Sequence, residues 1–124
     1  MIDAVEQQLL ALREQYPSAT LRVNPDGGHI VHVPDMALPP GWSLPSTDVW
    51  AVAPAGYPTV RPDCFFADPD LRLASGGEPA SSGQQSLDGI ARRWFSWHLS
   101  TWDPDHDGLL QYVRFCGRRL AEAR

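Results

Sequence analysis

Two side chains that could together perform acyl transfer, Ser96 and His98, stand two residues apart near the C-terminal end of the chain. In an extended segment, residues two apart point to the same face, with Cα atoms about 6–7 Å apart. A serine hydroxyl becomes a useful nucleophile when a base lies within about 2.6–3.2 Å of it. We therefore predict that Ser96 is a nucleophile and that His98 is its general base. The residues alone leave a second interpretation open, in which both are polar side chains of a half-buried strand without a catalytic role.

The neighbouring residues support an extended segment with one polar face. Apolar Phe95, Trp97 and Leu99 alternate with polar residues at positions 96, 98 and 100. This period of two predicts that the apolar side chains enter a core and that the polar ones face outward.

Two cysteines offer thiol chemistry, but their contexts are apolar. Cys64 precedes Phe65 and Phe66 on a predicted buried strand, and Cys116 lies on the apolar stripe of a predicted helix. A buried cysteine usually behaves as a small hydrophobic residue, whereas a reactive thiol needs an accessible, electropositive setting. We expect neither thiol to be essential.

No metal site or cofactor is predicted. The run from Asp103 to Gly108 resembles the start of a calcium loop, but its twelfth position is Arg114 instead of a bidentate glutamate. His29 and His32 are three apart on a predicted strand and therefore point to opposite faces, so they cannot bind one zinc ion together unless the strand bends. Asp105 and Asp107 are interpreted as residues at the start of the last helix.

Composition limits the class of protein. The 124 residues suit one domain, 1–124, with one modest core, and a hydrophobic content of 43% indicates a folded chain. The net charge of −5 and the absence of a basic cluster argue against nucleic-acid binding, and the apolar runs are too short for a membrane span. Two cysteines without an apparent signal peptide favour a cytoplasmic location. All ten cationic residues are arginine, so the chain offers no lysine as an acyl acceptor.

The pattern of apolar residues predicts helices only near the two ends. A helix is expected from Ile2 to Gln15, and another is expected to begin near Asp105 with a stripe of Leu109, Val113, Cys116 and Leu120. Between them we predict short strands at 20–23, 29–33, 48–53 and 64–66, with Asn24-Pro25-Asp26-Gly27-Gly28 as a hairpin turn. Residues 34–45 and the Gly/Ser-rich stretch 73–86 are predicted loops. This order favours an α+β fold with an antiparallel meander.

The same order resembles the ubiquitin-conjugating (UBC) fold, and Tyr57-Pro58-Thr59-Val60-Arg61-Pro62 is close to the Tyr-Pro-x-x-x-Pro that follows the third strand of that family. Further pieces are similar to a bacterial branch of the superfamily in which an aromatic-Ser-x-His segment replaces the usual cysteine loop. They are Ala53-Pro54-Ala55-Gly56, Pro62-Asp63, Phe95-Ser96-Trp97-His98, Trp102 and Asp107-Gly108-Leu109.

The chain departs from the classical enzymes of that family at two points. It has no cysteine between Cys64 and Cys116, and Asp68-Pro69-Asp70 stands where the family has His-Pro-Asn. A second alignment lays Gly83-Gln84-Gln85-Ser86-Leu87-Asp88 on the family's Gly-x-x-Cys-Leu-Asp loop. In that register Ser86 would replace the catalytic cysteine, so Ser86 is the alternative nucleophile.

The resemblance implies a component of a bacterial ubiquitin-like conjugation pathway. Its partners would be a ubiquitin-like protein and the adenylating activating enzyme that supplies it, often encoded together with a peptidase. The chain would receive the ubiquitin-like protein, as an oxyester if a serine is the nucleophile. The alternative is a non-catalytic UBC-like scaffold that binds either partner without a covalent intermediate.

Overall fold

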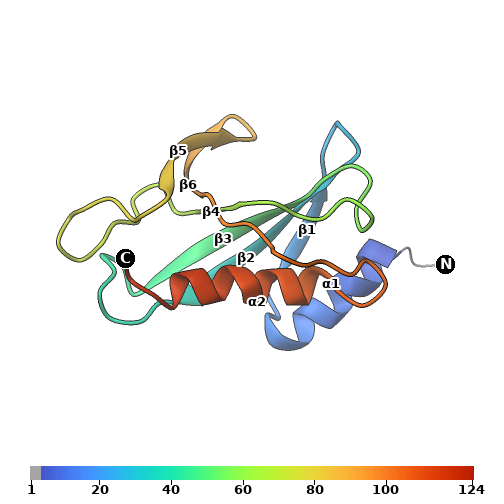
Figure 1. Ribbon diagram of the computed structural model, residues 1–124, viewed down its shortest axis with the longest axis horizontal. Helices are drawn as coiled ribbons and strands as arrows, with labels where there is room; N and C mark the ends of the chain where they lie inside the picture. Colours follow the sequence, from blue (N-terminus) through green and yellow to red (C-terminus); the bar gives the residue numbers. More distant parts are fainter. Residues whose placement is uncertain (1–3) are drawn as a thin grey trace.

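A computed structural model describes residues 4–124 (Figure 1). The elements follow in the order α1 (Ala4–Gln15), β1 (Thr20–Val23), β2 (His29–Ala37), β3 (Ser46–Ala53), β4 (Phe65–Ala67), β5 (Ser82–Leu87), β6 (Ile90–Phe95) and α2 (Leu109–Leu120). The predicted start of the first helix at Ile2 lies outside the described residues. Neither helix is long and apolar enough to cross a membrane, within the part of the chain that the structure describes.

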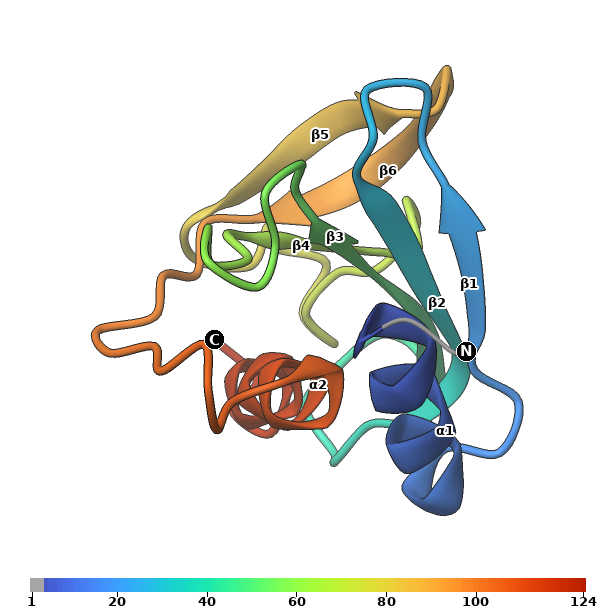
Figure 2. The same ribbon diagram turned by 90° about the vertical axis from the view of Figure 1, so that its right-hand side faces the viewer.

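The six strands form one antiparallel sheet in the order β1-β2-β3-β4-β6-β5. Both helices lie side by side on one face of this sheet, and the β5–β6 hairpin lies on the far side (Figure 2). Helices segregated to one face of an antiparallel sheet define the α+β class, so the predicted fold class is confirmed.

The main core fills the space between the helices and the sheet. The predicted stripe of α2 is buried: Leu109, Val113, Cys116 and Leu120 are all at most 2% exposed. They pack with Leu12 of α1 and with the inward side chains of the strands. The expectation that Cys116 is a core residue is therefore confirmed.

A second, smaller cluster lies on the other face of the sheet. Ile30, Trp50 and Phe66 are nearly buried there, and Leu87 and Trp94 of the β5–β6 hairpin pack against them. The guanidinium of Arg92 lies 3.7 Å from the centre of the Trp50 ring. An ion pair between Arg22 on β1 and Asp88 in the hairpin turn joins the two ends of the curved sheet.

The β5–β6 hairpin corrects one prediction. Residues 73–86 were expected to form a loop, but residues 82–87 are a strand that pairs with β6 from Ser82–Phe95 to Leu87–Ile90. The strand at residues 65–67 is consequently not the last one. Backbone pairing with β6 outweighs the low strand propensity of this Gly/Ser/Gln-rich sequence.

Other element boundaries also differ from the predictions. β2 continues past Pro34 to Ala37 through an irregularity between Val33 and Met36, and β3 begins at Ser46. α2 begins at Leu109 with Gly108 as its N-cap, and not near Asp105. Asp105 and Asp107 lie in the preceding loop, where the Asp107 carboxylate accepts a hydrogen bond from the Asp103 amide (2.8 Å).

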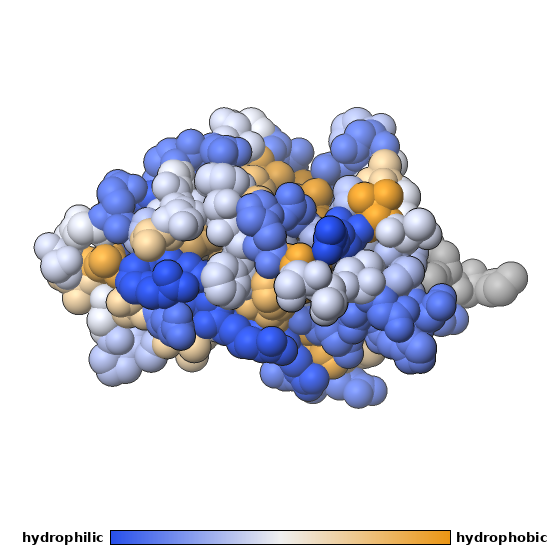
Figure 3. All heavy atoms as spheres, in the orientation of Figure 1, coloured by the Kyte–Doolittle hydropathy of each residue, from blue (hydrophilic) through white to orange (hydrophobic). Residues whose placement is uncertain are grey.

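The face of the molecule seen in the orientation of Figure 1 is mostly polar. On the face seen in Figure 3, hydrophilic side chains cover most of the area, and apolar atoms appear in the gaps between them. This distribution agrees with the composition of the chain.

Candidate active site

Ser96 and His98 follow directly after β6, which ends at Phe95. They were predicted to lie on a strand, but residues 96–99 have no regular secondary structure. Their backbone is nevertheless held in place: the Ser96 amide donates to the Ser81 carbonyl (2.8 Å), and the indole of Trp97 donates to the Phe115 carbonyl on α2 (3.0 Å). Trp97 therefore anchors the segment, and its two neighbours point outward.

The other side of the site is the turn that leads into β4. Cys64 has a φ of +60°, a left-handed conformation that is uncommon for a residue with a Cβ. Its amide donates to the Trp97 carbonyl (3.2 Å), and its carbonyl accepts a hydrogen bond from the Tyr112 hydroxyl. Burial raises the pKa of the Tyr112 phenol, so this donor stays protonated. These contacts hold residues 63–64 beside residues 96–98.

Ser96, His98 and Asp63 form a continuous chain of hydrogen bonds. Oγ of Ser96 lies 3.0 Å from Nε2 of His98, and Nδ1 of His98 contacts Oδ1 of Asp63. The predicted approach of Ser96 to His98 is thus present in the structure. Asp63 was not predicted as a site residue.

The order of these contacts determines which groups carry protons. An ionised carboxylate can only accept, so Nδ1 of His98 bears the hydrogen that is donated to Asp63. In the neutral imidazole Nε2 is then an acceptor, and the Ser96 hydroxyl donates to it. This is the arrangement in which a histidine can remove the proton of a serine nucleophile while a carboxylate fixes its tautomer.

The site is open to solvent. The side chains of His98 and Asp63 are 61% and 63% exposed, whereas Ser96 is half-buried. Exposure leaves room for a large acyl donor to approach, such as the end of a protein chain. It also weakens the Asp63–His98 attraction relative to a buried pair.

Cys64 differs from its prediction. It was expected on a buried strand, but it precedes β4 and is half-buried beside Asp63 and His98. Burial raises the pKa of its thiol, and the negative charge of Asp63 raises it further. The thiolate is therefore disfavoured, which agrees with the expectation that Cys64 is not an activated nucleophile.

Ser86 lies in a different part of the molecule. It is exposed on β5 and pairs with Ala91, four positions along the strand from Ser82, which pairs with Phe95. Four residues of a strand span about 13 Å, so Ser86 is well separated from the histidine beside Ser96. The structure brings Ser96, and not Ser86, to a candidate base.

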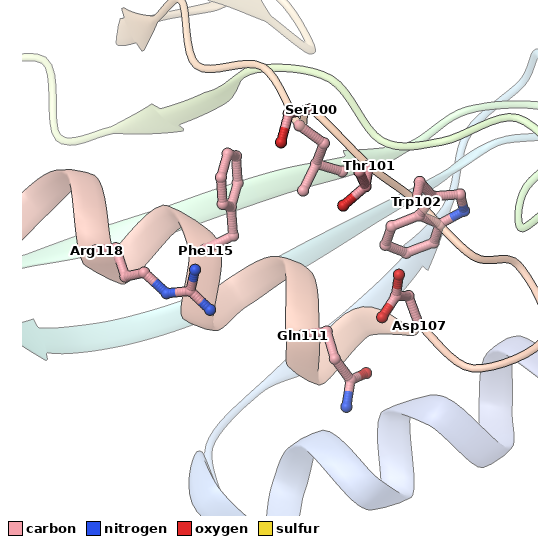
Figure 4. Close-up of a pocket in the computed structure, with 8 residues that line it drawn as sticks. Ser100, Thr101, Trp102, Asp107, Gln111, Phe115 and Arg118 are labelled. Carbon is pink, nitrogen blue, oxygen red and sulfur yellow. The ribbon is translucent and has the colours of Figure 1, made fainter.

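A groove adjoins the segment that carries His98. It has a volume of about 220 Å³ and runs between residues 99–102 and α2. Phe115 and Arg118 rise from α2 on one side, and Ser100 to Trp102 line the other (Figure 4). The indole of Trp102 donates to the Pro58 carbonyl (2.8 Å), which ties this wall to the Tyr57–Pro58 turn.

The comparison of the sequence with known families assigns a family to this fold. A family model described as prokaryotic E2 family E matches residues 6–123, almost the whole chain. The chain belongs to this family, and the resemblance to a bacterial E2-like (ubiquitin-conjugating-enzyme-like) branch is confirmed. No curated protein and no solved structure matches the sequence significantly.

Proposed function

We propose that this protein is an E2-like acyl carrier that receives a ubiquitin-like protein from an adenylating activating enzyme and holds it as an ester on Ser96. One observation carries the proposal. Ser96, His98 and Asp63 are hydrogen-bonded in the order that activates a serine hydroxyl, in a chain that belongs to a prokaryotic E2 family. Both partners are proteins of the cytoplasm in this proposal.

The first half-reaction loads the carrier. Oγ of Ser96 attacks the activated C-terminal carbonyl of the ubiquitin-like protein while Nε2 of His98 takes the hydroxyl proton. The activating enzyme's leaving group, AMP or a thiolate, departs as the new ester bond forms. Asp63 stabilises the imidazolium that results and keeps the proton on Nδ1 throughout.

The second half-reaction transfers the acyl group. After His98 has released the first proton to solvent, an amine attacks the ester carbonyl and Nε2 of His98 takes a proton from the attacking nitrogen. His98 passes this proton to the Ser96 oxygen as the ester bond breaks and the amide forms. An ester is a weaker acyl donor than a thioester, so correct positioning of the amine matters more. Because the chain has no lysine, its own side chains cannot compete as amine acceptors.

The experiment is reconstitution with the ubiquitin-like protein, the activating enzyme and ATP. The wild-type chain should form a covalent adduct that survives thiol reductant but is cleaved by hydroxylamine or hydroxide. Ser96→Ala should abolish the adduct, whereas the matched serine variant Ser86→Ala and Cys64→Ala should retain it. An adduct that is lost in Cys64→Ala and is cleaved by reductant would show that the bond is a thioester to Cys64 and not an ester to Ser96. Loss of the adduct in Ser86→Ala alone would show that Ser86 on β5 is the nucleophile.

A second candidate function is a non-catalytic scaffold, and the residues after β4 favour it. The segment that matches the family's His-Pro-Asn reads Asp68-Pro69-Asp70, so no asparagine amide is available there to stabilise an oxyanion. Asp70 stands in the place of that asparagine, and a carboxylate only accepts hydrogen bonds. Under this alternative the wild-type chain binds its partners without forming any adduct.

A further inference from the structure

Three side chains of the site share a property that acyl transfer does not use. A carboxylate oxygen of Asp63, Sγ of Cys64 and a ring nitrogen of His98 all lie within 4.8 Å of one another. Thiolate sulfur, imidazole nitrogen and carboxylate oxygen are the ligand types that zinc prefers. Within residues 4–124 this is the only group of three or more such side chains close enough to share an ion.

We propose that Asp63, Cys64 and His98 form a zinc site, and that zinc bound there switches off Ser96. The binding of zinc stands on the geometry of the three ligands alone. The inhibitory effect rests on the proposed function, because it requires Ser96 to be the nucleophile.

The backbone explains why two adjacent residues can serve as ligands together. Consecutive side chains of an extended segment point to opposite faces, so Asp63 and Cys64 would normally diverge. The left-handed conformation of Cys64 interrupts that alternation. Hydrogen bonds on both sides of Cys64, from its amide to Trp97 and from Tyr112 to its carbonyl, fix the backbone that carries the sulfur.

Only a small closure is needed to complete the site. Tetrahedral zinc with bonds of about 2.0–2.3 Å places its ligand atoms about 3.3–3.8 Å apart. Asp63 and His98 are both more than half exposed, so rotation of their side chains can bring their ligand atoms toward the sulfur. Three protein ligands leave the fourth position to water, as in zinc sites that are not purely structural.

Metal binding and base catalysis compete for the same imidazole. Nδ1 is the nitrogen that faces Asp63, so zinc takes this nitrogen in place of the hydrogen bond. The thiol proton of Cys64 is released to solvent, and the imidazole hydrogen moves from Nδ1 to Nε2. Nε2 then carries a hydrogen toward Ser96 and can no longer accept the hydroxyl proton.

Cobalt(II) tests the site without any conjugation assay. Titration of the reduced, chelator-treated full chain should give the near-ultraviolet absorption of a thiolate-to-cobalt charge transfer, and zinc should abolish it at one ion per chain. Cys64→Ala should lose the absorption, whereas the matched variant Cys116→Ala should keep it. Asp63→Ala and His98→Ala should each bind zinc at least about tenfold more weakly by calorimetry, and His32→Ala should bind as the wild type does.

Each result supports or overturns one half of the proposal. No charge-transfer absorption in the wild type, or absorption that survives Cys64→Ala in a chain whose circular dichroism is unchanged, overturns the site. In the reconstituted reaction, saturating zinc should slow adduct formation at least about tenfold, chelator should restore it, and Cys64→Ala should be resistant. Cobalt binding without this inhibition overturns the switch but leaves the site. Failure of all adduct formation counts against the proposed function, and the cobalt result still decides the site.

Discussion

Two of the histidine–aspartate pairs in this molecule consist of the same two side chains but differ in what they can do. At the candidate site, Asp63 contacts Nδ1 of His98, and Nε2 faces a serine hydroxyl. On the face of the sheet away from the helices, the Asp48 carboxylate contacts Nε2 of His32 (2.8 Å), and the imidazole is stacked on Trp50 with ring centres 4.8 Å apart.

The two pairs differ in which imidazole nitrogen contacts the carboxylate, and in whether another side chain covers the imidazole ring. Asp48 also accepts a hydrogen bond from the Asp35 amide (3.0 Å), so its carboxylate joins β3 to the irregular part of β2. The side chains of His32 and Asp48 are only 34% and 30% exposed. The pair at His32, which we call the clamp, therefore joins β2 to β3, whereas the pair at His98 leaves a ring nitrogen directed at the Ser96 hydroxyl.

Removal of the imidazole should give the largest difference between the two pairs in the rate of adduct formation. We expect His98→Ala to slow adduct formation by roughly 10²–10⁴-fold, because a positioned general base contributes about that much. His32→Ala should leave the rate within a few fold. Single-turnover loading followed on gels measures both. Equal rates for His98→Ala and the wild type would remove His98 from the mechanism.

Loss of the carboxylate charge should have a smaller effect on the same rate. Asp63→Asn should slow loading by about 10- to 100-fold, less than the roughly 10⁴-fold cost at a buried triad aspartate, because Asp63 is largely exposed. Asp48→Asn is the matched control and should load at the wild-type rate. If both variants load equally well, the contact between Asp63 and His98 has no catalytic role.

The cysteines sharpen the comparison, since only the pair at His98 has a thiol beside it. In chelator-treated buffer Cys64→Ala should load within about threefold of the wild-type rate and change the free energy of unfolding by less than about 0.5 kcal/mol. Cys116→Ala should cost about 1 kcal/mol or more, because Cys116 is fully buried. Urea unfolding monitored by tryptophan fluorescence measures the cost. A Cys64→Ala variant that is the less stable of the two would contradict the placement of Cys64.

The smallest expected effect is on stability at the clamp. Asp48→Ala removes two hydrogen bonds at a partly buried position and should destabilise the chain by about 0.5–1 kcal/mol. Asp63→Ala should cost less, because the pair at His98 is exposed and surface ion pairs contribute little. Urea midpoints of the two variants give the comparison directly, and the reverse order would show that Asp63 supports the fold.

The sequence was sufficient for the parts of the fold and site that depend on local periodicity. The stripe of α2 and the approach of Ser96 to His98 both follow from spacing along a short segment. Asp63 escaped prediction because it comes from a turn more than thirty residues earlier, which the left-handed Cys64 and the Trp97 carbonyl place beside the histidine. No local sequence pattern predicts a contact between residues so far apart in the chain.

The missed hairpin did carry a signal. Asp88 and Gly89 join β5 to β6, and both have positive φ values, 60° and 76°. An Asp-Gly pair between two runs is typical of a two-residue hairpin turn that needs such values. The polar composition of residues 82–86 predicts a loop, because the strand propensity there is low. The strand forms because its backbone pairs with β6.

The ion pair between Arg22 and Asp88 has a consequence for how this chain behaves at high concentration. The strand β5 lies at one edge of the sheet and carries no charged residue or proline, and such an edge can pair with strands from other molecules. By fastening the hairpin turn to β1, the pair holds this edge curved over the sheet and unsuited to flat pairing. Because both partners are exposed, salt weakens the pair, so self-association should increase with ionic strength.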